Sequence, residues 1–135
     1  MTTTEHILLI DDDESDNEFH QIVIKNSGIN ARVSTINDSR KALECWVKKS
    51  EMEELVLPDV VFLDVNMPAL NGFELLDRLA ELPDPLQRLR AMKVYILSTS
   101  EPEVYTEYMA KHKNLVRGFY TKPLTKEILR EVANG

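Results

Sequence analysis

One aspartate, Asp64, ends an apolar run within the stretch VVFLDVNMPALNGFELL, residues 60–76. A carboxylate at the end of a buried strand is costly unless a partner compensates its charge. Three more carboxylates, those of Asp11, Asp12 and Asp13, follow an earlier apolar run, HILLI. Because the carboxylates come directly after apolar runs, we expect them to lie at the ends of neighbouring strands.

Hydroxyl groups and a lysine follow two later apolar runs. KVYILS ends in Ser98, which Thr99 follows, and VRGFYT ends in Thr121, directly before Lys122. If all four runs are parallel strands of one open sheet, their carboxyl ends share one edge, and ligands of such sheets bind there. The sequence therefore predicts a cluster of carboxylates, hydroxyls and one ammonium group at that edge.

Such a cluster needs added positive charge. Two like charges about 4 Å apart repel by roughly 4 kcal/mol at an effective dielectric constant of about 20. Lys122 offsets one charge, and hard carboxylate oxygens with room for water suit Mg²⁺. A carboxylate beside a divalent cation, a lysine and a hydroxyl can become an acyl phosphate, because these neighbours stabilise the transferring phosphoryl group. We therefore predict that Asp64 accepts a phosphoryl group, assisted by Lys122 and by a hydroxyl group from the end of the KVYILS strand.

The runs that position these residues alternate with helical patterns. Near-continuous apolar runs, typical of strands buried in a parallel sheet, predict strands within residues 7–10, 59–64, 93–98 and 116–121, and a more alternating run predicts another at 32–36. The segments between them carry apolar residues at helical spacing. Five alternations of strand and helix predict an α/β fold with an open, doubly wound parallel sheet.

Local signals place the helices. Phe19, Ile22 and Val23 predict the packing face of the first helix. Residues with side chains suited to helix N-caps are Asp13, Asp38, Thr125 and Ser100, the last within a capping box. Two connections are long: KKSEMEELVLP is expected to extend the second helix, and residues 82–92 are expected to form an insertion after the third.

Length and composition exclude several classes of protein. The 135 residues predict one domain, 1–135, with a sizeable core and no separate output domain. A net charge of −7 argues against a nucleic-acid partner, because binding to the phosphate backbone needs clustered lysine and arginine. The single cysteine, Cys45, excludes an internal disulfide and is typical of a reducing compartment. No signal peptide or membrane-spanning run is visible, so we expect a cytoplasmic protein without a membrane partner.

Four motifs in this order, LLIDDD, FLDVNMPALNGFELL, ILSTS and YTKPL, resemble the receiver domain of two-component response regulators along nearly the whole chain. The resemblance implies a flavodoxin-like (βα)5 fold with strand order 2-1-3-4-5. It implies that Asp64 is the phosphorylated aspartate and that Asp12 ligates Mg²⁺ directly. It also implies that Asp11 acts largely through water, while Asn66 offers its backbone carbonyl to the metal.

The remaining matches concern the lysine and the switch. Lys122 matches the lysine of the family, and the Lys122–Pro123 bond is similar to one that is cis in these domains. Ser98 matches the switch hydroxyl, where threonine is more usual, and so lacks a methyl group that restricts the rotamer. Phe119 matches the aromatic switch position but carries no phenol hydroxyl for a partner to contact.

The resemblance further implies a role in phosphorelay signalling. A histidine kinase or a histidine phosphotransfer protein would donate the phosphoryl group to Asp64. Movement of Ser98 and Phe119 would then change the surface around the helix after the fourth strand, the fifth strand and the last helix. That surface would bind a downstream protein whose identity is unknown. The chain would catalyse only its own phosphorylation and dephosphorylation, so we do not expect an enzyme in the wider sense.

Other interpretations of the same residues stay open. A phosphohydrolase of the haloacid dehalogenase type also uses an aspartate nucleophile, but it needs a second aspartate two positions later, where this chain has Asn66. A scaffold that is never phosphorylated could keep the same fold, although such versions usually lose the acidic pair or the lysine. Thr99 competes with Ser98, since a one-residue shift of the strand exchanges their sides. For Asp13 we favour a helix cap over a metal ligand.

Overall fold

The computed structural model describes residues 6–50, 58–68, 70–81, 92–99, 106–113 and 115–134. Its centre is a five-stranded parallel sheet in the order β2-β1-β3-β4-β5. The strands are β1 (His6–Ile10), β2 (Arg32–Ile36), β3 (Val60–Leu63), β4 (Lys93–Ser98) and β5 (Val116–Thr121). The predicted flavodoxin-like architecture and strand order are therefore confirmed.

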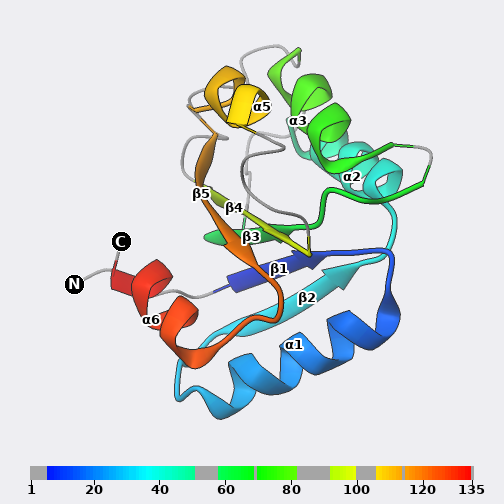
Figure 1. Cartoon of the computed structure of the whole chain (residues 1–135). Helices are drawn as coiled ribbons and strands as arrows, with labels where there is room; N and C mark the ends of the chain where they lie inside the picture. The colour runs from blue at the N-terminus through cyan, green and yellow to red at the C-terminus, as the bar shows by residue number, and fades with distance from the viewer. Residues whose placement is uncertain are drawn as a thin grey trace.

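Helices cover both faces of this sheet. They are α1 (Glu14–Asn26), α2 (Ser39–Ser50), α3 (Gly72–Ala80), α5 (Thr106–Lys111) and α6 (Lys126–Asn134). Figure 1 shows α1 and α6 on one face and α2, α3 and α5 on the other. The sheet is therefore doubly wound, as the alternation of strands and helices predicted.

The central strands are buried because both of their faces pack against helices. One apolar cluster joins the sheet to α2 and α3 and includes Ile10 and Leu63. A second cluster joins the sheet to α1 and α6 and includes Leu9 and Phe62. Successive side chains of a strand point to opposite faces, so neighbouring residues contribute to different clusters. This burial explains why the sequence of these strands is almost continuously apolar.

The register of the central strands decides which residues meet at their carboxyl ends. Ile10 pairs with Leu63, and Leu63 pairs with Ile96. The backbone N–H of Asp64 donates to the carbonyl oxygen of Ile10 at 2.9 Å. Asp11 and Asp64, the residues that follow the first pair, therefore leave the sheet side by side.

The packing face of α1 differs from the predicted one. Phe19 and Ile22 are 51% and 56% exposed, and Val23 is half-buried. Asn17 and His20 are buried instead. The side-chain amide of Asn17 donates to the backbone carbonyl of the residue that follows β1, at 2.8 Å, and this hydrogen bond permits its burial. Of the three predicted residues only Val23 packs against the core, beside the fully buried Ile24 of the second cluster. The prediction was wrong for Phe19 and Ile22, and it missed Asn17 and His20 because it considered only apolar residues.

Three of the predicted helix caps are confirmed. Asp13, Asp38 and Thr125 precede α1, α2 and α6, and each side chain accepts a backbone N–H from the first turn of its helix, at 2.9, 2.9 and 3.2 Å. These bonds satisfy donors that a helix cannot satisfy internally. The helix starts are therefore fixed next to the strand ends that they follow.

Several sequence predictions lie outside the described residues. They are the capping box at Ser100, the continuation of the second helix after Ser50, and residues 82–91 of the insertion. Within the part of the chain that the structure describes, no helix combines the length and the apolar character needed to cross a membrane.

Candidate functional site

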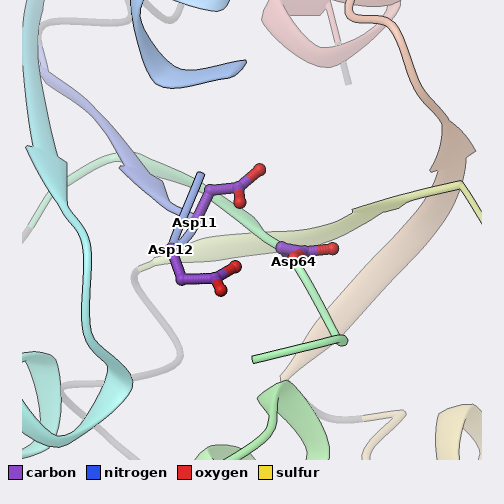
Figure 2. A group of neighbouring side chains, drawn as sticks. All are labelled: Asp11, Asp12 and Asp64. Carbon is purple, nitrogen blue, oxygen red and sulfur yellow. The ribbon is translucent and has the colours of Figure 1, made fainter. Parts of the chain in front are cut away.

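The carboxyl ends of β1 and β3 bring three carboxylates together. Asp11 and Asp12 follow β1, and Asp64 follows β3. One oxygen atom from each of the three carboxylates lies within 4.8 Å of the corresponding oxygen atoms of the other two. Figure 2 shows the three carboxylate groups on the same side of the strand ends. Asp11 and Asp64 are buried, at 5% and 6% exposure, whereas Asp12 is exposed and forms the solvent side of the cluster.

Lys122 approaches these carboxylates from the end of β5. Its Nζ atom lies 2.6 Å from Oδ2 of Asp11 and 3.8 Å from Oδ1 of Asp64. Its backbone N–H donates to the carbonyl oxygen of Ser98 at 2.9 Å, so the end of β4 also holds this position. The Lys122–Pro123 peptide bond is cis, as the family resemblance implied.

A fourth carboxylate, that of Asp16 in the first turn of α1, also contacts Lys122. The distance from Oδ2 of Asp16 to Nζ of Lys122 is 2.7 Å. The Asp16 side chain is 39% exposed, so this contact lies at the rim of the site. Sequence reasoning did not identify Asp16. The available signal was the cap at Asp13, because a helix that begins so soon after β1 places its first turn beside the sheet edge.

Lys122 carries its positive charge in spite of its burial. Burial alone would lower the pKa of this lysine. Hydrogen bonds to Asp11 and Asp16, with the negative charge of Asp64, outweigh that effect and raise the pKa above its usual value. The site therefore contains one permanent ammonium group among four carboxylates.

The carboxyl group of Asp64 holds a proton more tightly than an ordinary aspartate. Burial is the main cause and the negative charge of Asp11 the next, and together they raise the pKa of Asp64 to about 6. The charge of Lys122 and a backbone hydrogen bond from Asn66 act in the opposite direction. At neutral pH Asp64 is mostly ionised, and its charge is only partly compensated by the protein.

The predicted hydroxyl and aromatic residues lie on β4 and β5. Ser98 is fully buried, whereas Thr99 is exposed, so Ser98 is the hydroxyl enclosed at the end of β4. Phe119 pairs with Ile96 across the two strands and is half-buried against the cluster that includes α3. Both residues therefore lie on the strands whose ends converge with Lys122.

The loop after β3 and the start of α3 approach Asp64 closely. Asn66 is exposed, and its contact with the Asp64 carboxylate is the backbone hydrogen bond named above. Gly72 is the first residue of α3, and a Cβ atom built on it would lie 2.6 Å from the carbonyl oxygen of Asp64 and 3.1 Å from Cα of Val65. A residue with a side chain does not fit so close to this backbone, and sequence reasoning did not identify the constraint.

The donor set fits a hard divalent cation. All the candidate side-chain ligands of Asp11, Asp12 and Asp64 are carboxylate oxygens, and they lie close enough to share one ion. Oxygen-only sites that keep an open, solvated side suit Mg²⁺ and Mn²⁺ better than softer metals. With a cation bound, the site would present a buried carboxylate beside two sources of positive charge, an arrangement suited to an anionic phosphoryl group.

Comparisons with known proteins agree with this geometry. The family model for the response regulator receiver domain matches residues 7–134. The response regulator Rcp1 of Synechocystis sp. is 28% identical over 129 residues, which cover 96% of this chain and 84% of Rcp1.

Solved structures share the fold. The Mn²⁺-bound form of Rcp1 aligns with a TM-score of 0.67 at 27% identity, covering 96% of this chain and 90% of that one. A two-component response regulator from Cytophaga hutchinsonii aligns with a TM-score of 0.82 at 24% identity, covering 98% and 96%. The phosphorylated cyanobacterial phytochrome response regulator RcpA aligns with a TM-score of 0.67 at 23% identity, covering 98% and 91%.

Proposed function

Because this chain belongs to the response regulator receiver domain family, we propose that it is a signalling module switched by phosphorylation of Asp64. One observation carries the proposal: a buried, mostly ionised carboxylate lies beside two further carboxylates that can share a metal ion with it, and within 3.8 Å of a positively charged lysine. Such an arrangement is costly for a resting protein and favourable for binding a phosphoryl group.

The proposed chemistry is a direct transfer from a phosphohistidine. A carboxylate oxygen of Asp64 attacks the phosphorus atom, and the P–N bond of the donor breaks as its electron pair returns to the imidazole. The ionised state of Asp64 at neutral pH provides the nucleophile. Because Nζ of Lys122 is 3.8 Å from Oδ1 of Asp64, a small movement of the side chain brings it to an oxygen of the bound phosphoryl group.

A divalent cation completes this proposal. Asp11, Asp12 and Asp64, with the backbone carbonyl of Asn66, would hold Mg²⁺. When bound, the ion supplies positive charge that stabilises the phosphoryl oxygens during transfer. The Mn²⁺-bound form of the relative Rcp1 supports a divalent ion here. The phosphorylated state of the structural neighbour RcpA supports phosphorylation of this type of domain.

Phosphorylation would be read out on the surface formed by α5, β5 and α6. We expect the Ser98 hydroxyl to donate to the phosphoryl group and Phe119 to turn inward. The helices around the site are connected, which supports such a response: Nε2 of His112, next to the end of α5, lies 2.8 Å from Oδ1 of Asp77 in α3. Since α3 begins at Gly72, against the backbone of Asp64, a change at the site can reach α5 through rigid elements.

The proposed partners follow from the chemistry. A histidine kinase or a histidine phosphotransfer protein would supply the phosphoryl group, and an unidentified downstream protein would bind the switched surface. We place this exchange in the cytoplasm, where the single cysteine, Cys45, stays reduced. The chain would act on no other substrate and would catalyse only its own phosphorylation and dephosphorylation.

Intact mass after incubation with acetyl phosphate tests the proposal. We expect a single phosphoryl adduct in the presence of Mg²⁺ and none in EDTA, because Asp64 needs the cation to accept an anionic group. The adduct should be absent in Asp64→Asn. The matched control is Asp13→Asn, which makes the same carboxylate-to-amide change beside the site and keeps a residue able to cap α1.

Two results would contradict the proposal. An adduct that persists in Asp64→Asn would assign the phosphoryl group to another residue. No adduct in the wild type, together with no binding of the phosphoryl mimic beryllofluoride in the presence of Mg²⁺, would favour an interaction domain that is not phosphorylated.

A further inference from the structure

We propose that Asp16 is a positioning residue that holds Lys122 away from Asp64 and thereby slows phosphorylation; this inference rests on the proposed function. An ammonium group has three N–H donors. In this structure two of them point to short contacts, at 2.6 Å to Asp11 and 2.7 Å to Asp16. The contact with the proposed acceptor, Oδ1 of Asp64, is longer, at 3.8 Å.

The two short contacts respond differently to a bound cation. Asp11 belongs to the group of carboxylates that can share a metal ion, together with Asp12 and Asp64. A cation at that position competes with Lys122 for the charge of Asp11 and weakens this contact. Asp16 is not a member of that group. Its contact with Lys122 therefore persists in the metal-bound site, where Lys122 has to move toward the phosphoryl group.

Asp16 opposes phosphorylation in two ways, and both of them slow the reaction. It accepts a charge-assisted hydrogen bond from Lys122 that must weaken before the ammonium group can bind a phosphoryl oxygen. It also adds a negative charge at the partly exposed rim of the site, where it repels an anionic phosphoryl group. Because the Asp16 side chain is 39% exposed, solvent screens both effects, and we expect a modest change rather than an all-or-none one.

The test compares variants of Asp16 in the full chain. Asp16→Asn keeps an oxygen acceptor but removes the charge, so phosphorylation by acetyl phosphate should become about two- to fivefold faster, and beryllofluoride should bind tighter by a similar factor. Asp16→Glu keeps a carboxylate that can reach Lys122 and should stay close to the wild type. The control Glu18→Gln removes an exposed carboxylate from the same helix, at a residue whose side chain is not among the contacts of Lys122. Its rate should also stay close to the wild-type rate.

The possible outcomes are distinct. An unchanged or slower rate in Asp16→Asn overturns the inference while the wild-type adduct on Asp64 stands. An equal acceleration in Glu18→Gln also overturns it, because general charge would then explain the effect. A large loss of Mg²⁺ affinity in Asp16→Asn would make Asp16 a metal ligand instead. Absence of any adduct in the wild type is the separate result that removes the proposed function itself.

Discussion

The carboxylate of Asp64 is charged in a place where the fold provides incomplete compensation. Its pKa is raised to about 6 in the folded protein, from an ordinary value of 3.8. A raised pKa means that the folded state binds the proton more tightly than the unfolded state. The resulting contribution to stability is fully present below about pH 4 and is lost as the pH rises through about 6. At neutral pH the ionised group therefore destabilises the resting protein.

Asp64→Asn should remove this cost. At pH 7.5 we expect its free energy of unfolding to exceed that of the wild type by about 1–3 kcal/mol, since about 1.4 kcal/mol corresponds to one pKa unit. The difference should shrink as the pH falls from 7 to 4, because Asp64 of the wild type becomes protonated. Urea denaturation of both proteins across this range, without divalent cations, measures the effect. A variant that is less stable than the wild type at pH 7.5 would contradict the assignment.

At the scale of residues, the sequence was sufficient to predict the position of side chains that lie directly after strands. Asp11, Asp64 and Lys122 follow strands directly, so the register of the sheet determines where they lie. Asp16 was missed because its contact depends on the rotation of α1 and on the reach of a lysine from another strand. The choice between Ser98 and Thr99 also needed the structure, since a shift of one residue exchanges the two sides of a strand.

At the scale of elements, the position of α3 depends on the absence of a side chain at Gly72. Ala at this position would gain up to about 1 kcal/mol in helix propensity. However, its Cβ atom would lie 2.6 Å from the Asp64 carbonyl oxygen, so α3 or the loop after β3 would have to move. The overlap is with backbone rather than with a flexible side chain, and we therefore expect the steric cost to exceed the gain.

Gly72→Ala should lower the free energy of unfolding by about 1–3 kcal/mol, the usual cost of overpacking. Urea denaturation measures the change. The control is Gly118→Ala in β5, where the nearest atom to a new Cβ is a ring atom of Tyr95 at 3.4 Å, an ordinary contact. Its effect should be smaller. Equal stabilities for Gly72→Ala and the wild type would show that α3 is not held against Asp64 in this way.

The sequence predicted the positions of the strands better than it predicted which face of a helix is buried. All five strands lie where they were predicted. The signal is clearest in the central strands, because burial on both sides of a sheet leaves a continuous apolar pattern. The face of α1 was assigned to Phe19 and Ile22, yet both are exposed. Asn17 replaces them because it can bury a side chain whose amide is hydrogen-bonded to the end of β1. A pattern of apolar residues alone does not reveal such a polar contact.

At the scale of the whole molecule, the net charge of −7 makes the acidic edge of the sheet a favourable place for a cation. Mg²⁺ should stabilise the folded state, because a ligand that binds only this state adds about 2.7 kcal/mol at a hundred times its Kd. Thermal unfolding during a Mg²⁺ titration, at constant ionic strength set with KCl, separates binding from general screening.

Asp12→Asn is the variant to compare with the wild type in this titration. Because Asp12 is exposed, the substitution should leave folding intact. We expect most of the Mg²⁺-dependent stabilisation to be lost in this variant. The control Glu14→Gln, an exposed carboxylate in the first turn of α1, should keep it. Stabilisation of equal size in Asp12→Asn and the wild type would place the cation elsewhere.

The phosphorylated residue can be identified directly after chemical reduction. Borohydride converts an aspartyl phosphate into homoserine and leaves unmodified aspartate unchanged, so peptide mass spectrometry identifies the residue that carried the phosphoryl group. This distinguishes among carboxylates that lie within a few ångströms of one another. We expect homoserine at position 64 alone, and only when Mg²⁺ was present during incubation with acetyl phosphate. Homoserine at Asp11, Asp12 or Asp16, with aspartate retained at position 64, would contradict this expectation.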